Sequence, residues 1–133
     1  MKERTMKRRR TGSKESGAAA IELALLIPVL ITILFGIIEF GLGFNASITV
    51  TQAAREAVRP LALGKGTAAA DTAGKAAASP LTVVVDQMVP SSGLCTSGTN
   101  ASVRVNYSFS YDIPFFKSDT ITIRRKAVMR CGG

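Results

Sequence analysis

The feature that most constrains this chain is a long apolar stretch near its N-terminus. Residues 18–44 are 27 residues with one carboxylate near each end, and no charge lies between Leu23 and Ile38. As a helix, this stretch would be roughly 40 Å long at about 1.5 Å per residue. That is enough to cross about 30 Å of hydrocarbon with some tilt or overhang. We therefore predict a membrane-spanning helix over residues 18–44.

A basic leader, residues 1–17, precedes this helix. It carries seven Lys or Arg against two Glu, and therefore +5 of the net charge of +8. Basic residues next to a spanning helix resist translocation, so we predict that the N-terminus stays in the cytoplasm and the rest is exported. The residues expected to determine this topology are Lys7, Arg8, Arg9, Arg10 and Lys14. Binding of nucleic acid or anionic lipid by residues 8–10 is the alternative, and we expect no nucleic-acid partner.

A secretory signal peptide is a second way to read the apolar stretch. Such a peptide has a shorter apolar region, of about 7–15 residues, followed by small residues at the cleavage site. Here the apolar run is longer, and the residues after it, Gly41-Leu42-Gly43-Phe44-Asn45-Ala46, make a poor cleavage site. We therefore do not expect cleavage after the helix.

Glu22 is the unusual residue of the stretch, because a charge inside a spanning helix is unfavourable and often functional. In one interpretation it sits at the cytoplasmic interface, where a helix N-terminus favours negative charge. In the other, the chain is cut after Gly17 and Ala18 becomes the new N-terminus. The α-ammonium of Ala18 would then lie one helical turn from Glu22, where the two charges can pair within a chain or between neighbours.

The combination of basic leader, Gly17, Glu22 and long apolar helix resembles the processing region of type IV pilin-like proteins. Its details resemble the TadE-like pseudopilins of the tight-adherence (Tad/Flp) pilus system. The matching residues are Gly17-Ala18-Ala19-Ala20-Ile21-Glu22-Leu23-Ala24-Leu25, Pro28, Phe35-Gly36-Ile37-Ile38-Glu39-Phe40-Gly41 and Gln52-Ala53-Ala54-Arg55-Glu56-Ala57-Val58-Arg59. The spacing of Gly17 and Glu22 alone would be a weak signal, but leader, motif and helix in register make a strong one.

The resemblance implies a structural role and a set of partners. It implies cleavage between Gly17 and Ala18 by a prepilin peptidase, and association with other pilin or pseudopilin subunits, the Tad assembly machinery and the membrane. The length of 133 residues argues against the major pilin, which in this system resembles a much shorter peptide. We expect no cofactor and no enzymatic activity.

Residues 45–79 are expected to form an amphipathic helix and an Ala-rich segment. Apolar residues recur at helical spacing, with polar residues on the other side, at Ala46, Val50, Ala53, Ala54, Ala57, Val58 and Leu61. We expect this helix to continue the membrane helix and to be interrupted near Arg59-Pro60. Residues 67–79 are equally consistent with a short second helix and with a mobile linker.

Residues 80–133 are expected to form an exported β-rich domain. Residues 102–111 alternate strictly between apolar and polar, and residues 120–129 follow the same period of two. Two such runs joined by residues 112–119 predict an antiparallel pair, to which residues 81–86 would add a third strand. So small a sheet cannot bury a core alone, so the apolar face of residues 46–61 should cover it. The predicted class is α+β: a long N-terminal helix packed on a small antiparallel sheet of about three strands.

The side-chain chemistry of the chain offers no catalytic or metal site. There is no His, and Cys95 and Cys131 are the only cysteines, so the usual nucleophile–base sets and metal ligand sets are missing. Both cysteines fall on the predicted exported side, where a disulfide is favoured over two free thiols. A bridge closing about 37 residues would stabilise the domain by roughly 4 kcal/mol in the chain-entropy model.

Two functional interpretations follow from these features. In the first, the chain is a pilin-like assembly subunit of a tight-adherence pilus, processed after Gly17. In the second, it is an uncleaved single-pass protein whose exported domain binds a component of the cell envelope. Whether Glu22 is needed for assembly distinguishes the two.

Overall fold

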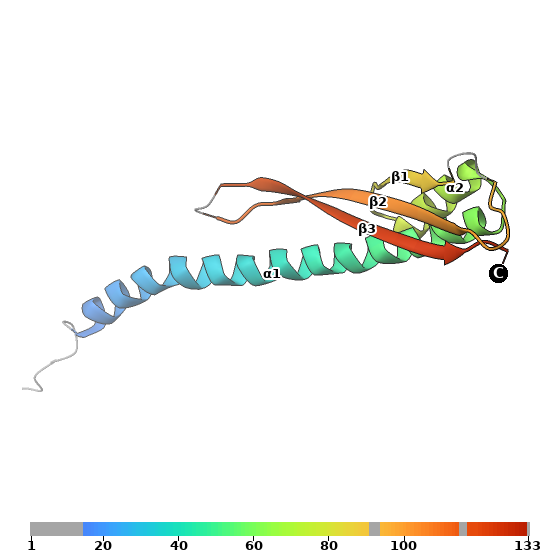
Figure 1. Ribbon diagram of the computed structural model, residues 1–133. Coiled ribbons are helices and arrows are strands. Elements are labelled where there is room, and N and C mark those ends of the chain that lie inside the picture. The colour runs from blue at the N-terminus through green and yellow to red at the C-terminus, as the bar shows by residue number, and fades with distance from the viewer. Residues whose placement is uncertain (1–14, 91–93, 115–116, 133) are drawn as a thin grey trace, which may run out of the picture.

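The computed structural model describes residues 15–90, 94–114 and 117–132. One helix, α1 (Glu15–Ala62), runs through almost the whole molecule, and a small head forms around its C-terminal third (Figure 1). At 48 residues, α1 is roughly 72 Å long at 1.5 Å per residue. Its first third bends away from the rest, and Pro28 lies inside the helix; proline is a usual cause of such bends.

The head consists of a second helix, α2 (Thr67–Ala78), and three strands, β1 (Val84–Val89), β2 (Asn100–Tyr111) and β3 (Asp119–Arg130). The strands form one antiparallel sheet in the order β1-β2-β3. The sheet and α2 both contact α1. These elements confirm the predicted α+β class, with a long helix packed on a small antiparallel sheet.

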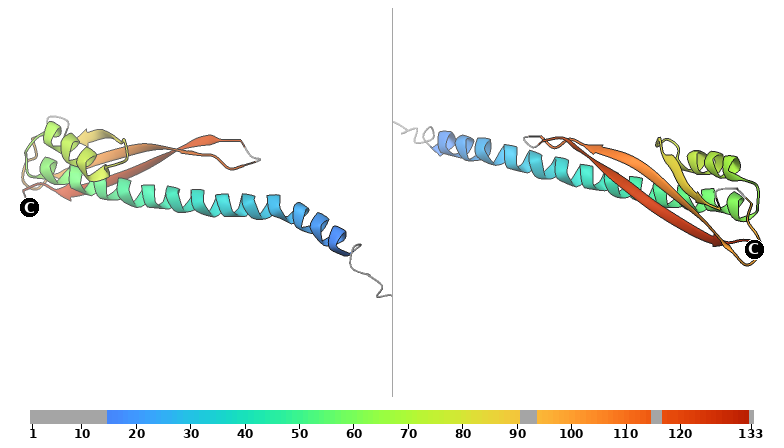
Figure 2. Two further views of the ribbon diagram at one scale, coloured as in Figure 1. Left: turned by 180° about the vertical axis from the view of Figure 1, so that it is seen from behind. Right: turned by 45° about the horizontal axis from the view of Figure 1, so that its top comes forward.

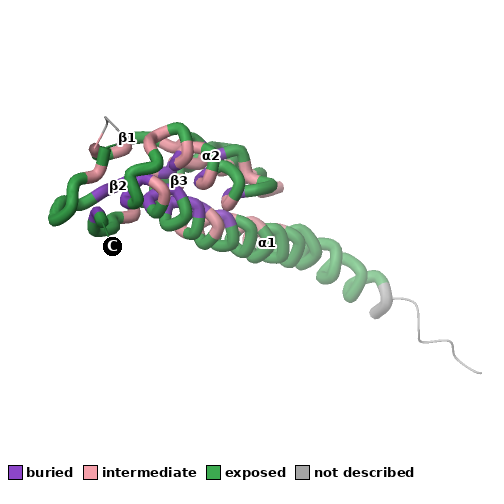
Figure 3. The backbone as a smooth tube through the Cα atoms, turned by 90° about the vertical axis from the view of Figure 1, so that its right-hand side faces the viewer, coloured by how far each residue is buried: buried purple, intermediate pink, exposed green. Residues whose placement is uncertain are grey.

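The core lies between the C-terminal third of α1 and the half of the sheet that contains the start of β2 and the end of β3 (Figure 3). All the positions predicted for the apolar face of α1 are buried, with at most 4% exposed: Ala46, Val50, Ala53, Ala54, Ala57, Val58 and Leu61. On β2, the alternate residues Ala101, Val103 and Val105 are buried against them. The predicted cover of the sheet by this helix face is therefore confirmed.

The predicted interruption near Arg59-Pro60 is wrong, because α1 continues to Ala62. Proline lacks an N–H and so removes one helical hydrogen bond, but Leu61 and Ala62 are buried and hold the last turn in place. Two residues after the end of the helix, Gly64 adopts a left-handed φ of 69°, and its N–H donates to the carbonyl of Leu61 at 3.0 Å. A glycine in this conformation is a common helix terminus.

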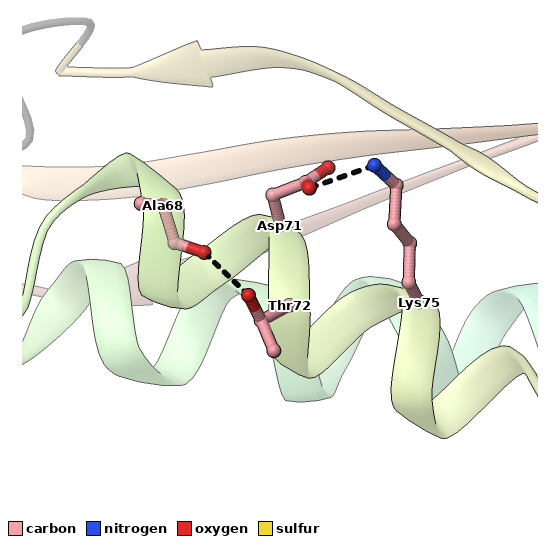
Figure 4. A network of polar contacts seen from close by, with 4 residues as sticks. All are labelled: Ala68, Asp71, Thr72 and Lys75. Carbon is pink, nitrogen blue, oxygen red and sulfur yellow. Dashed lines mark hydrogen bonds and ion pairs between the residues drawn. The ribbon is translucent and has the colours of Figure 1, made fainter.

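The Ala-rich segment is a helix rather than a linker. Gly74 lies so close to the rest of the head that an added Cβ would stand 3.0 Å from the Cβ of Ala57 and 2.9 Å from a methyl of Val85. On the outer side of α2, Lys75 donates to Asp71 at 2.7 Å, and the Thr72 hydroxyl donates to the carbonyl of Ala68 at 3.0 Å (Figure 4). Such exposed pairs contribute only a few tenths of a kcal/mol, so close packing on α1 is what orders this helix.

The predicted strand boundaries need two corrections. The first strand was predicted at residues 81–86 and lies three residues later, at Val84–Val89, because the N–H of Leu81 donates to the carbonyl of Ala78 and closes a turn after α2. The predicted connection 112–119 is one residue shorter, since β3 begins at Asp119, paired with Tyr111.

The β2–β3 hairpin is longer than the core that it covers. Figures 1 and 2 show it projecting beyond α2 and β1, toward the N-terminal half of α1. The apolar face of β3 is covered only in part: Ile123 and Ala127 are half-buried, whereas Ile121 is 56% exposed. The far half of the hairpin lies over helix residues that the sequence assigned to the membrane span.

Candidate functional site: an exposed apolar helix and the hairpin beside it

None of residues 17–45 of α1 is buried. The helix is long and apolar enough to cross a membrane, and none of its most apolar window is buried inside the molecule. Its large side chains lie open, with Leu25 71% and Phe40 77% exposed. An exposed apolar surface of this size requires an apolar environment outside the chain.

Gly17, Ala18 and Glu22 lie together at the start of α1, and all three are exposed. A Cβ added to Gly17 would meet no atom within 4 Å, so the fold does not require a glycine there. Ala18 and Glu22 are four residues apart, which places them on one face of the helix. Within the described residues, Asp71 and Lys75 form a salt bridge, and Glu22 has no ion-pair partner.

The other residues predicted to direct topology, Lys7, Arg8, Arg9, Arg10 and Lys14, lie outside the described residues. Among those that are described, no group of three or more His, Cys, Asp or Glu is placed to hold a metal ion.

Cys95 and Cys131 are joined by a disulfide, with their Cα atoms 5.4 Å apart. Cys131 is 3% exposed and follows β3 directly. Its N–H donates to the carbonyl of Thr99 at 2.9 Å, and the N–H of Gly132 donates to the carbonyl of Ala62 at 3.3 Å. The bridge thus lies where the end of β3, the segment before β2 and the end of α1 meet.

A groove of about 490 Å³ lies between α1 and the far half of the hairpin. Its lining is almost entirely apolar and includes Phe40, Phe44, Phe109, Tyr111, Ile113 and Ile121. The rings of Phe40 and Phe44 stack with their centroids 6.5 Å apart. Both rings are more than half exposed, so the head leaves this apolar surface uncovered.

The groove is closed at the end nearer the core. There a Cβ added to Gly43 would stand 3.4 Å from the ring of Phe109, so helix and hairpin approach each other closely. The guanidinium of Arg125 donates to the hydroxyl of Ser47 and fixes the hairpin to α1 at that same end. Two charged residues line the groove, Arg125 and, further toward the N-terminus of α1, Glu39.

The sequence patterns do not predict this groove. The signal was present as the alternation at Phe109 and Tyr111, which continues past the point where the short core ends. What could not be known is that the hairpin would run back along α1, because only the antiparallel register of β2 on β3 and the attachment of Arg125 to Ser47 establish that direction.

Comparison with known proteins gives one match. Residues 17–59 match the family model described as TadE-like protein, which confirms the resemblance drawn from the same residues. The match begins at Gly17, covers the apolar helix and ends within the face that covers the sheet. Searches of curated proteins and of solved structures found no match. Residues 17–59 are thus similar to TadE-like proteins, and the match covers about a third of the chain and ends before α2 and the sheet.

Proposed function

We propose that this chain is a pilin-like assembly subunit of a tight-adherence pilus, processed after Gly17 and inserted with its head outside the cytoplasmic membrane. The observation that carries the proposal is the TadE-like match over residues 17–59, which contains the glycine, the glutamate and the exposed apolar helix in register. The chain would associate with pilin or pseudopilin subunits and the Tad machinery.

Two features of the structure support processing at Gly17. The glycine has no packing partner that would demand its small size, whereas a small residue suits an extended segment that must enter a membrane protease. Glu22 has no ion-pair partner in the described part of the chain. A new α-ammonium at Ala18 would supply the missing positive charge one turn away.

The hairpin bears on where the helix leaves the bilayer. Beside residues 36–47 it presents exposed polar side chains at Ser110, Thr120 and Thr122, and β3 is an edge strand. Unpaired backbone groups of an edge strand are not tolerated in hydrocarbon. We therefore place the outer boundary near Glu39 rather than at residue 44. From Ala18 to Glu39 the helix rises roughly 32 Å, close to the hydrocarbon thickness of about 30 Å.

The mass of the mature protein tests the proposal. We expect the chain extracted from membranes of cells that contain the prepilin peptidase to begin at Ala18. Gly17→Val should leave the longer precursor, because a β-branched side chain obstructs the cleavage site. Gly36→Val, at a glycine further along the same helix, is the matched control and should be processed normally. Recovery of the full 133-residue chain from such cells would instead favour an uncleaved, membrane-anchored binding module.

A further inference from the structure

The groove between α1 and the hairpin is closed at one end and open at the other. It is closed where Phe109 meets Gly43 and where Arg125 donates to Ser47. Toward the hairpin tip, where Gly36, Glu39 and Ile113 line the groove, a Cβ added to Gly36 would meet no described atom within 4 Å. With the bilayer boundary near Glu39, the open end of the groove faces the membrane surface.

We propose that this groove binds one acyl chain of an outer-leaflet phospholipid, with the lipid phosphate on Arg125. The inference rests on the membrane anchorage in the proposed function. Pockets of about 300–1,000 Å³ lined by apolar side chains with few polar groups are typical of small-ligand sites. The groove has this character, with a volume of about 490 Å³.

The position of the groove identifies its occupant. Its floor, residues 36–47 of α1, begins at the end of the part of the helix that we place in hydrocarbon. Phe40, Phe44 and Ile121 are 77%, 61% and 56% exposed, and their burial against an apolar ligand is favourable. The nearest apolar material is the lipid that surrounds the same helix.

The two charges in the groove set the direction of the lipid. Arg125 is held beside Ser47, and Glu39 lies eight residues earlier on α1, roughly 12 Å nearer the membrane. A phosphate is attracted to the guanidinium and repelled by the carboxylate, so the headgroup belongs at the Arg125 end. The acyl chain then points toward the membrane, in the direction that outer-leaflet chains already follow.

A helix from another protein chain is the competing occupant, and the dimensions disfavour it. A helix with its side chains is about 10–12 Å across, whereas the groove narrows at Gly43, where even an added Cβ would stand 3.4 Å from the ring of Phe109. A single acyl chain is much thinner than a helix and can lie along the apolar lining between Arg125 and the open end.

Photo-crosslinking tests the proposal in the full chain. The protein is reconstituted in nanodiscs of phosphatidylcholine and phosphatidylglycerol that include a phosphatidylglycerol with a diazirine in its acyl chain. After illumination, labelled peptides are mapped by mass spectrometry. We expect labelling of hairpin residues 109–121 in addition to the spanning part of α1, which serves as the internal standard.

Arg125→Gln should reduce hairpin labelling about tenfold, as expected for loss of a charge-assisted hydrogen bond. Arg124→Gln is the matched control, since it removes the same charge from the neighbouring residue on the opposite face of β3, and it should leave the labelling unchanged. Ile121→Trp, at an exposed position that the core does not need, should fill the groove and also abolish hairpin labelling.

Three results would overturn the proposal: an unlabelled hairpin, labelling that Arg125→Gln and Ile121→Trp leave unchanged, or crosslinks from the groove to a second protein chain. Alkaline washing of the membranes separates these failures from failure of the proposed function. A protein that remains in washed membranes but shows no hairpin labelling refutes only the lipid site. A protein that is washed off refutes the membrane anchorage on which both depend.

Discussion

Glu22 is the residue on which the proposed assembly depends most directly. It lies on an exposed turn of α1, four residues after Ala18, with no ion-pair partner in the described part of the chain. In a bundle of packed apolar helices, an unpaired carboxylate would be surrounded by material that does not solvate it. Pairing with the new α-ammonium of the same or an adjacent subunit removes that penalty.

We therefore predict that Glu22→Ala inserts normally but fails to assemble. Removal of a carboxylate eases partitioning into the membrane, whereas breaking a buried pair leaves one charge uncompensated and costs roughly 3–5 kcal/mol. The measurement is complementation of a deletion strain, with membrane content of the protein and surface pili quantified in parallel. Glu22→Asp, which keeps the charge, is the control and should restore part of the piliation.

Normal piliation with Glu22→Ala would contradict the pairing and favour a Glu22 that faces headgroup water. A fall in membrane content would instead show that Glu22 acts in insertion. The motif predicts the position of this residue from the sequence, because Gly17, Ala18 and Glu22 are near neighbours along the chain. Gly74 is the opposite case: its contacts with Ala57 and Val85 are distant in sequence, and local spacing does not predict them.

At the scale of the elements, the contact of α2 with α1 and β1 depends on the missing side chain of Gly74. We predict that Gly74→Val destabilises the head by about 1–3 kcal/mol, the usual range for overpacking, since an added Cβ alone would be within 3.0 Å of two neighbours. Thermal unfolding of the full chain in detergent, followed by circular dichroism, measures the change.

Ala76→Val is the matched control, because Ala76 lies on the exposed side of the same helix. It carries the small loss of helix propensity on replacing alanine by a β-branched residue, at most about 0.7 kcal/mol, without any new contact. Equal unfolding temperatures for the two variants would show that α2 moves freely enough to accommodate the side chain and that the close approach at Gly74 is unimportant.

Hydrophobic periodicity predicted the elements in which buried and exposed positions alternate regularly along the chain. Apolar residues recur every three to four residues on the buried face of α1 and every two residues on β2. Both patterns were predicted correctly. The continuation of α1 through Pro60 was not, because the burial of Leu61 and Ala62 outweighs the local effect of proline. The shift of β1 has the same origin, since the turn closed by Leu81 and Ala78 depends on how α2 is packed.

At the scale of the whole molecule, the sequence predicts the long helix and the sheet, but not how the β2–β3 hairpin lies along α1. A long N-terminal helix, and the cover of the sheet by residues 46–61, follow from the apolar stretch and the amphipathic pattern after it. The groove does not, because it arises from the hairpin running back along α1. Its apolar lining is divided between residues 36–47 and residues 109–125, which no local pattern connects.

The orientation of the whole chain yields the last prediction. Lys7, Arg8, Arg9, Arg10 and Lys14 precede the helix, and basic residues near a spanning helix stay on the cytoplasmic side. Replacing all five by Gln should shift the chain from one orientation to a mixture, in which part of the population has its head in the cytoplasm. Replacing Arg55 and Arg59 on the far side is the control and should leave the head outside.

The disulfide reports the outcome within the same sample. Disulfides persist outside the cytoplasm and are rare within it, so a correctly oriented head keeps Cys95 and Cys131 bridged and resists alkylation without reductant. An inverted head presents two thiols that react, and proteases added to spheroplasts do not reach it. If the five-Gln variant stays fully protease-accessible and unalkylated, the leader does not determine topology, and the apolar helix must set its orientation by other means.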